Sequence, residues 1–392
     1  MKCAIVGCGY IAEFYAATRA QHPELQWHGA WDDDPARLET SARRWGVRAY
    51  ASLDELRADP AVELVLNLTN PRSHADVTQR CLEAGRHVYS EKPVAMTAAE
   101  AIRLGDVAAS RRVQLASAPS SVLGETAQTV WHAIRQGAVG RVRLVYGNFD
   151  DGMIAPHRSP WQWKNAAGVP WPARDEFEIG CTYEHAGYLL TWLAAFFGPA
   201  ESVTSFSSCQ IPDKGIAVSA MAPDFAVGCV QYADGIVARL TFGLVAPRDK
   251  SLLIVGDDGC LFVGNVRDEG APVFVRPSVV GGWRGLVASR LGAVDRLLGA
   301  RWQWPGAHTL FQKRYPMRRP ASVSASRDKP VDFLRGPAEL VNAVSEGRQN
   351  RLSPRFAAHI VEITERIQHP DRFMNHRVQT TFDPVNPLPW AM

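Results

Sequence analysis

A glycine-rich run near the start of the chain is the first feature that could do chemistry. Residues 7–12 read Gly-Cys-Gly-Tyr-Ile-Ala and follow the apolar run 3–6. In this G-x-G-x-x-A spacing one glycine makes a tight turn, the next lets the backbone approach a pyrophosphate, and a small third residue lets helix and strand pack closely. The N-terminus of the following helix then offers free N–H groups to the phosphates. The residues expected to bind a dinucleotide are Gly7, Gly9, Tyr10 and Ile11.

An acidic residue after the second apolar run extends this prediction. Asp32 lies twenty residues after Ala12, at the end of the run 27–31. A carboxylate there accepts hydrogen bonds from the ribose hydroxyls of NAD. A 2′-phosphate would meet the like charges of residues 32–34, so we expect NAD rather than NADP, although Arg37 lies near enough to weaken the discrimination. The alternative is a glycine turn followed by a solvated acidic run.

A second motif, Glu91-Lys92-Pro93, follows the apolar run 87–90. Oxidation of a secondary alcohol removes a hydride and a proton, so it needs a base within hydrogen-bond reach and a cation beside the developing alkoxide. A lysine near the nicotinamide meets both needs, and burial lowers a lysine pKa towards neutrality. Ligands bind at the strand ends of such sheets. The alternative is a surface lysine that follows a strand.

Together these motifs resemble the Gfo/Idh/MocA family, which includes glucose–fructose oxidoreductase and inositol dehydrogenase. The resemblance is strong over about residues 1–150 and weaker beyond. It implies hydride transfer between a nicotinamide and a secondary alcohol or ketone of a sugar, cyclitol or sugar derivative. It also implies that Lys92 contacts the substrate hydroxyl and that Pro93 follows a cis peptide bond. The further residues that it implies at the cofactor are Asn70, His74, Glu91, Lys92, Trp163 and Lys164.

The region 180–197 reads as a helix and holds the other catalytic candidates. Family members usually carry an acid and a histidine there, one turn apart. His185 matches that histidine through the Trp192 that follows it, but Cys181 then stands in place of the acid. An alternative register puts Thr182 at the histidine position. Acid–base roles are therefore spread over His185, Glu184 and Tyr188, with Glu178 two turns away.

His185 and Glu184 each have a structural role as the alternative to a catalytic one. A core histidine satisfied by a backbone carbonyl is the alternative for His185. A solvated or structural carboxylate is the alternative for Glu184, because it lies on a different helical face from His185.

The elements that position these residues follow two patterns. In residues 1–120, short apolar runs alternate with helical patterns, which predicts a Rossmann NAD-binding domain with a parallel sheet. Residues 121–392 predict an α+β domain with an open-faced, mostly antiparallel sheet. Its expected elements are a helix at 123–136, a strand at 142–147, a Trp- and Pro-rich loop at 156–172, strands through 202–262 with turns at 234–235 and 257–259, and a helix at 354–368.

Residues 265–330 fit neither pattern and read as an insertion with a short helix near 283–298. The basic stretch 313–319 could grip a phosphate or a nucleotide-sugar diphosphate, or lie on an acidic membrane surface together with that helix. We favour a solvated loop, because exposed charge runs commonly bind nothing.

Composition excludes several classes of protein. The 392 residues suit two domains, and a formal charge of +3 gives no reason to expect nucleic acid. No apolar run reaches the roughly 20 residues of a membrane span, and the N-terminus lacks signal-peptide character. The seven cysteines form no C-x-x-C pair, so we expect reduced, mostly buried thiols, no metal and a cytoplasmic location. The resemblance adds a homodimer or homotetramer joined through the exposed face of the second sheet.

Three functions remain open. The leading one is an NAD-dependent dehydrogenase or ketoreductase of a sugar or cyclitol. The second is an NAD-dependent glycoside hydrolase that acts by transient oxidation, which would give no net change in NADH. The third is a cofactor-binding protein without turnover, against which the retained Glu91-Lys92-Pro93 motif argues.

Overall fold

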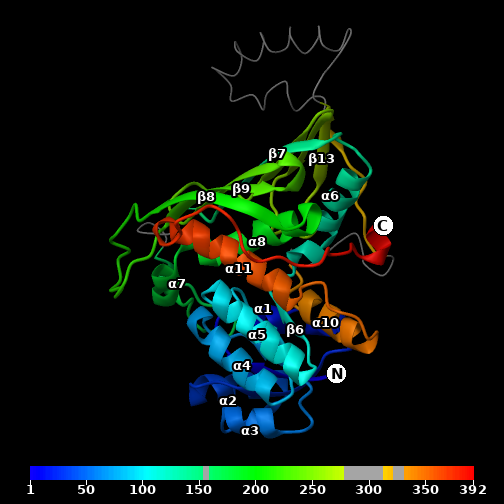
Figure 1. The fold of residues 1–392 in the computed structure, drawn as a ribbon. Helices are drawn as coiled ribbons and strands as arrows, with labels where there is room; N and C mark the ends of the chain where they lie inside the picture. Colours follow the sequence, from blue (N-terminus) through cyan, green and yellow to red (C-terminus); the bar gives the residue numbers. More distant parts are fainter. Residues whose placement is uncertain (153–158, 278–311, 321–330) are drawn as a thin grey trace.

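The computed structural model describes residues 1–152, 159–277, 312–320 and 331–392, and its architecture is built on two sheets (Figure 1). The helix predicted near 283–298, and with it most of the insertion predicted at 265–330, lies outside the described residues.

The first sheet is parallel, has six strands and follows the order β3-β2-β1-β4-β5-β6. Strand order reverses between β1 and β4, and ligands of such sheets bind at the carboxyl ends beside that point. The predicted parallel sheet is therefore confirmed. Its strands are β1 (Lys2–Val6), β2 (Gln26–Trp31), β3 (Arg48–Ala49), β4 (Leu64–Asn67), β5 (His87–Ser90) and β6 (Leu115–Ser117).

Five helices accompany this sheet, and two of them differ from prediction. The sequence pattern predicts the first helix over residues 11–20, but it is shorter, because the Thr18 hydroxyl donates back to the Tyr15 carbonyl at 3.3 Å and competes with the helix. The third was not predicted, although Ser52 caps it by accepting the Glu55 N–H at 3.0 Å. The helices are α1 (Ala12–Ala16), α2 (Pro35–Trp45), α3 (Leu53–Ala58), α4 (His74–Glu83) and α5 (Ala98–Arg111).

The second sheet has eight strands in the order β14-β13-β12-β11-β7-β10-β9-β8. Among the described strands β7 and β10 pair in parallel and the other neighbours are antiparallel, as predicted. The expected turns separate β9 from β10 and β11 from β12. The strands are β7 (Val142–Asp150), β8 (Ala200–Ser208), β9 (Phe225–Tyr232), β10 (Val237–Gly243), β11 (Leu252–Gly256), β12 (Gly259–Val263), β13 (Val273–Pro277) and β14 (Lys313–Arg314).

Helices pack on one face of this second sheet. The helix α8 contacts β7, β9 and β10, and α6 contacts β13. Gly180, with φ of +90°, separates α8 from the shorter α7, which the sequence did not predict. The opposite face carries exposed side chains such as Phe206 and Arg239. The helices are α6 (Glu125–Arg135), α7 (Ala173–Ile179), α8 (Cys181–Phe197), α10 (Arg335–Ser345) and α11 (Pro354–Gln368).

The helix α11 lies between the two sheets and belongs to both cores (Figure 1). It contacts α5 of the first sheet on one side and α8, β8 and β9 on the other. Ala358 and Val361 pack into the core of the first sheet, whereas Ile363 and Ile367 pack beneath the second. The last helix of the chain therefore fixes the first sheet against the second.

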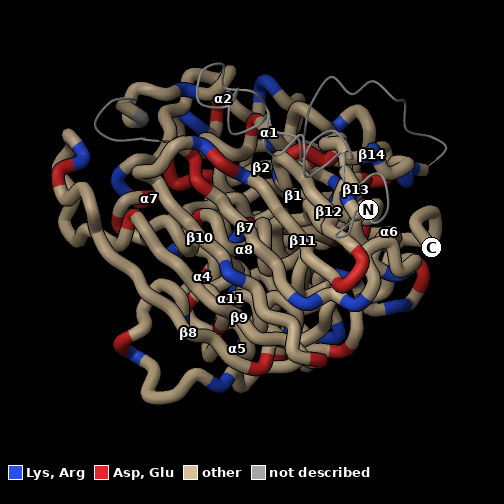
Figure 2. The backbone as a smooth tube through the Cα atoms, turned by 90° about the horizontal axis from the view of Figure 1, so that it is seen from above, with Lys and Arg blue, Asp and Glu red and all other residues tan. Residues whose placement is uncertain are grey.

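Charge is mixed over the molecule. Lys and Arg alternate with Asp and Glu along the tube in Figure 2. None of the described helices has the length and hydropathy that crossing a membrane requires. In the described part of the chain no cluster of His, Cys, Asp and Glu is arranged to hold a metal. All seven cysteines are free, and five of them are buried as expected.

Candidate active site

A cleft of about 310 Å³ opens at the carboxyl ends of the first sheet, where they face α8. Side chains from the dinucleotide loop, the loops after β4 and β5, the Trp-rich loop and α8 line it. The predicted site residues that meet in this cleft are Gly9, Tyr10, Ile11, Asn70, His74, Glu91, Lys92, Trp163, Glu184, His185 and Tyr188.

The loop after β1 has the shape that a pyrophosphate needs. Gly7 has φ of +92°, and a Cβ there would lie 2.7 Å from backbone atoms of Leu68 and Thr69. Only glycine fits such a position. A Cβ on Gly9 would have no neighbour within 4 Å, so the backbone is open to a ligand. Ala12 is buried, and its small side chain lets α1 pack closely against the sheet. With Gly7 and Gly9, this gives the loop a shape that fits a dinucleotide.

Asp32 is held behind this loop. Its Oδ2 accepts the Cys8 N–H at 2.6 Å, and its Oδ1 accepts from the Asp34 N–H at 2.8 Å and the Arg37 guanidinium at 2.7 Å. Burial raises the pKa of Asp32, but the hydrogen bonds from Arg37 and the backbone lower it overall. Arg37 thus offsets the negative charge on which the argument for NAD over NADP depends.

Buried hydrogen bonds fix the segment that carries Lys92. The Tyr15 hydroxyl donates to Glu91 Oε1 at 2.6 Å, and the Lys92 N–H donates to Glu91 Oε2 at 3.0 Å. The His74 ring lies between the carbonyl oxygens of Pro93 at 2.6 Å and Thr69 at 2.8 Å. The Lys92–Pro93 peptide is cis, as the resemblance implied. Glu91 and His74 therefore orient the lysine from behind.

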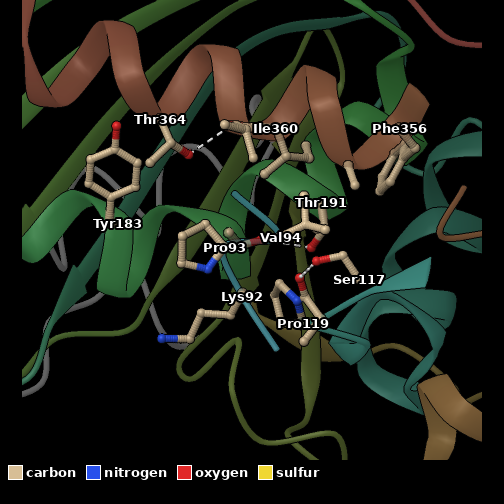
Figure 3. A pocket seen from close by; sticks show the side chains of 14 residues that line it. Lys92, Pro93, Val94, Ser117, Pro119, Tyr183, Thr191, Phe356, Ile360 and Thr364 are labelled. Atoms are coloured by element: carbon tan, nitrogen blue, oxygen red, sulfur yellow. Dashed lines mark hydrogen bonds between the residues drawn. The ribbon is translucent and has the colours of Figure 1, made fainter. Parts of the chain in front are cut away.

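A small cavity of about 20 Å³ lies on the other side of the Lys92 backbone. In Figure 3 the lysine amine points away from Thr191, Ile360 and Phe356, which line this cavity with Pro93. The apolar wall thus supports the lysine stem while the amine extends towards the cleft.

The Lys92 amine forms an ion pair in the cleft. Its Nζ lies 2.8 Å from Glu184 Oε2, and Glu184 in turn shares a hydrogen bond with the buried Glu176. Burial alone would lower the pKa of Lys92, but the Glu184 carboxylate raises it above the ordinary value. This corrects the expectation of a near-neutral pKa. The pKa of Glu176 is raised by burial and by Glu184, so Glu176 holds a proton more readily than Glu184 does.

His185 belongs to a second charged group on the same cleft. Its Nε2 lies 3.3 Å from Asp151 Oδ2, and Asp151 Oδ1 pairs with the buried Lys250. Phe149 stacks against the His185 ring with centroids 4.8 Å apart. His185 and Lys250 keep the pKa of Asp151 well below its usual range against the effect of burial. Burial lowers the pKa of Lys250 to about 8, with Arg267 adding to this effect and Asp151 opposing it.

Tyr188 forms the floor between these two groups. Its ring stacks on Phe149 with centroids 4.8 Å apart, and Lys92 Nζ and Arg267 Cζ lie 5.9 Å and 5.5 Å from the ring centroid. Burial raises the pKa of Tyr188, while the two cations oppose the shift. The hydroxyl therefore stays protonated and can donate a hydrogen bond.

Some sequence candidates lie elsewhere. Lys164 is exposed and lines a neighbouring cavity instead of the cleft. Thr182, the alternative to His185, is fully buried and does not line the cleft. Glu178 pairs with Arg72 at 2.6 Å outside it. The basic stretch 313–319 packs on α6, where Tyr315 meets His132 at 3.1 Å. Glu184 and His185 both line the cleft despite their different helical faces.

Five charged residues of the cleft and its border were not predicted from the sequence. Asp151 follows the end of β7, and polar residues at a strand end are a usable signal for a site. Glu176 lies in the unpredicted α7, and Arg248, Lys250 and Arg267 lie in loops without a motif. Only the folded chain brings these last three residues to the cleft or its border, so no local pattern could have found them.

This fold and cleft define a class of dinucleotide-binding enzymes, and comparison with known families agrees. Residues 1–118 match the model of the oxidoreductase family with an NAD-binding Rossmann fold, and residues 127–262 match the GFO/IDH/MocA C-terminal domain. The chain therefore belongs to the Gfo/Idh/MocA family of oxidoreductases.

Relatives in this family are similar over part of their length. The trans-1,2-dihydrobenzene-1,2-diol dehydrogenase of Sus scrofa is 31% identical over 269 residues, which cover 66% of this chain and 72% of that protein. An uncharacterized oxidoreductase of Schizosaccharomyces pombe is 30% identical over 218 residues, covering 54% of this chain and 56% of that relative.

Solved structures share the fold at low sequence identity. The aldose-aldose oxidoreductase from Caulobacter crescentus, complexed with glycerol, superposes with a TM-score of 0.70 at 18% identity and covers 95% of this chain and 97% of its own. The WlbA dehydrogenase from Bordetella pertussis, in complex with NADH and UDP-GlcNAcA, gives 0.67 at 18% identity, covering 97% and 98%.

Proposed function

We propose that the protein is an NAD-dependent dehydrogenase or ketoreductase that acts on a secondary alcohol or ketone of a sugar, cyclitol or sugar derivative. The observation that carries the proposal is the Lys92–Glu184 ion pair, which lies in the same cleft as the dinucleotide loop and His185. Two structural relatives, an aldose-aldose oxidoreductase and a dehydrogenase in complex with NADH and UDP-GlcNAcA, support the substrate class.

The nicotinamide supplies the site that accepts or donates the hydride. In this proposal Lys92 keeps its charge at working pH, because Glu184 stabilises the ammonium form. A fixed cation beside the reacting oxygen stabilises the alkoxide that develops as the hydride leaves. Lys92 is then the group that holds the oxygen, and it is not the final proton acceptor.

His185 receives the substrate proton in this mechanism. The Nδ1 is buried without a hydrogen-bond partner among the described residues, so the proton is taken up at Nε2, which Asp151 faces. A carboxylate on one ring nitrogen orients the imidazole and stabilises the imidazolium that forms. Tyr188 donates a hydrogen bond to the same substrate from the floor of the cleft. In the reduction direction the proton returns from His185 to the carbonyl oxygen.

The cofactor preference rests on Asp32. Its carboxylate lies where ribose hydroxyls would bind, and it would repel a 2′-phosphate. Arg37 reduces that repulsion, so we expect a moderate preference for NAD. Titration of tryptophan fluorescence with both cofactors tests it, and tighter binding of NADP would contradict it. An Asp32→Ala variant should bind the two cofactors more equally.

A polyol panel tests the reaction. Purified protein with NAD is mixed with sugars and cyclitols, and formation of NADH is followed by absorbance. The proposal predicts net NADH with at least one secondary alcohol. Cleavage of a glycoside without net NADH would instead identify a hydrolase that uses transient oxidation. NAD binding without either reaction across the panel would identify a binding protein.

A further inference from the structure

A second cavity of about 580 Å³ adjoins the cleft. The two share Tyr10, Phe14, Arg248 and Arg267, so they meet at a common wall. The ring of Phe14 lies between Tyr10 and Phe333, with centroids 5.5 Å and 5.6 Å apart, which gives the second cavity an aromatic side. A molecule whose reacting carbon sits at Lys92 can therefore extend past the arginines into additional space.

The two arginines lack the partners that such side chains usually have. In the described part of the chain, no group accepts a hydrogen bond from the guanidinium of Arg267 or Arg248. Arg267 is only half-exposed, and its sole close ring contact is Tyr188. A guanidinium carries five donors in a fork that matches carboxylate and phosphate. Its unused donors at the border of a cavity indicate an oxyanion ligand.

The neighbouring charges agree with this reading. Arg267 and Arg248 both add to the effect of burial that lowers the pKa of Lys250, so three cations lie close enough to repel one another. The two acids in the second cavity are engaged elsewhere, since Glu13 pairs with Arg44 at 3.0 Å and Asp268 accepts the Gly270 N–H at 2.9 Å. Tyr188 and the carboxylates on the cleft side raise the pKa of Arg267, so this guanidinium stays charged and can bind an anion on the side of the second cavity.

The backbone that presents the arginines is fixed. The segment before β11 and the segment after β12 lie side by side, because the Val266 N–H donates to the Lys250 carbonyl at 2.9 Å. Asn265 also accepts the Arg267 N–H at 3.1 Å. A binding group on a fixed scaffold loses little entropy when the ligand arrives.

We propose that Arg248 and Arg267 bind an oxyanion, either a carboxylate or a phosphate, carried by the part of the substrate that extends from the reacting carbon into the second cavity. The inference rests on the proposed function, because it narrows the substrate to an anionic sugar derivative.

The test measures binding to protein saturated with NAD by isothermal titration calorimetry. The probes are glucuronate, glucose 6-phosphate and UDP, with glucose as the uncharged reference. At least one anionic probe should bind more tightly than glucose, and its affinity should fall about 10- to 100-fold in Arg267→Gln and Arg248→Gln, the scale of a lost charged hydrogen bond. Binding of glucuronate alone identifies a carboxylate, and binding of the phosphorylated probes alone identifies a phosphate.

Three variants control the test. Arg143→Gln removes an exposed arginine that pairs with Asp257 at 2.9 Å on the second sheet, and it should leave the affinity unchanged. Arg267→Lys should retain part of the affinity. If Arg267→Gln does not fold, the exposed Arg248 carries the same test.

Anionic probes that bind no better than glucose, or that bind both glutamine variants as well as the parent protein, would overturn the inference. The two proposals can fail separately. The binding assay tests the anion site without requiring turnover, and the polyol panel tests the proposed reaction without requiring an anionic substrate. Arginine-dependent binding of an anionic probe without oxidation of any polyol would support the anion site and contradict the proposed dehydrogenase activity.

Discussion

Lys92 lines the cleft and Lys250 lies at its border, and their surroundings shift the pKa values of the two amines in opposite directions. Lys92 pairs with Glu184, and its pKa is raised. Lys250 pairs with Asp151, yet burial and the adjacent arginines lower its pKa to about 8. Both have a carboxylate partner, so the difference comes from the next neighbours, which are further acidic groups such as Glu176 and Glu91 around Lys92 and the arginines around Lys250. One group therefore keeps a fixed charge, and the other can change its charge near working pH.

The largest expected effect follows removal of the fixed charge. Lys92→Ala should lower turnover about 10³-fold, because it removes both the cation beside the alkoxide and a positioned donor. Folding and NAD affinity should be unchanged, as circular dichroism and fluorescence titration would report. Lys92→Arg keeps the charge and should retain more activity than the alanine variant. Turnover of Lys92→Ala close to that of the parent protein would contradict a catalytic role for the lysine.

The next effect concerns the proton. His185→Asn should lower turnover about 100-fold, the scale of one acid–base group, and should leave NAD affinity nearly unchanged. His132→Asn, on α6 and paired with Tyr315, is the matched control and should keep full activity. If the two variants behave alike, His185 is a core residue that stacks on Phe149.

Removing the carboxylate beside Lys92 should make its charge depend on pH. Glu184, whose pKa is lowered to about 2 by Lys92 despite its burial, is ionised throughout the working range. In Glu184→Gln burial still lowers the pKa of Lys92 and the largest influence that raises it is gone, so the lysine pKa falls. Turnover should drop about tenfold and decline further as pH rises.

Glu178→Gln on the adjacent α7 is the control for that change, because Glu178 lies outside the cleft. It should leave the pH profile as it is in the parent protein. An alkaline decline in Glu178→Gln as large as in Glu184→Gln would contradict the role of the Glu184 carboxylate.

The smallest effect should come from Lys250. As pH rises through about 8 the lysine loses a positive charge beside Asp151, which makes proton uptake by His185 easier. The oxidation rate should therefore rise roughly threefold across that pH range, since Asp151 lies between the two cations and offsets most of the field. Lys250→Met should abolish this rise, whereas Lys313→Met on β14 should keep it. A rise that persists in Lys250→Met would assign the titration to another group.

Local patterns predicted one half of this site well. Gly7, Gly9 and Lys92 follow buried strands of a parallel sheet, so their place at one edge is set by the alternation of apolar runs and helices. The other half depends on contacts distant in sequence. Cys181 stands where an acid was expected, and the structure instead brings Asp151 to His185 from the end of β7. No periodicity within α8 contains that information.

Electrostatic surroundings were equally hard to predict. Burial of Lys92 was foreseen, but the direction of its pKa shift depended on Glu184, which lies on a different face of α8 from His185. The cleft extends far enough around the helix to receive both side chains. The division at residue 120 and the association of subunits through the second sheet stay predictions.

The shared helix α11 has a consequence for how the chain unfolds. Because its side chains complete the cores under both sheets, neither core is closed until the carboxyl-terminal residues have docked. We expect a single cooperative thermal transition in place of two separate ones, and we expect a nascent chain to remain incompletely packed until α11 has left the ribosome. A Val361→Ala variant should thus lower the melting temperature of the whole molecule, although the side chain touches only the first core.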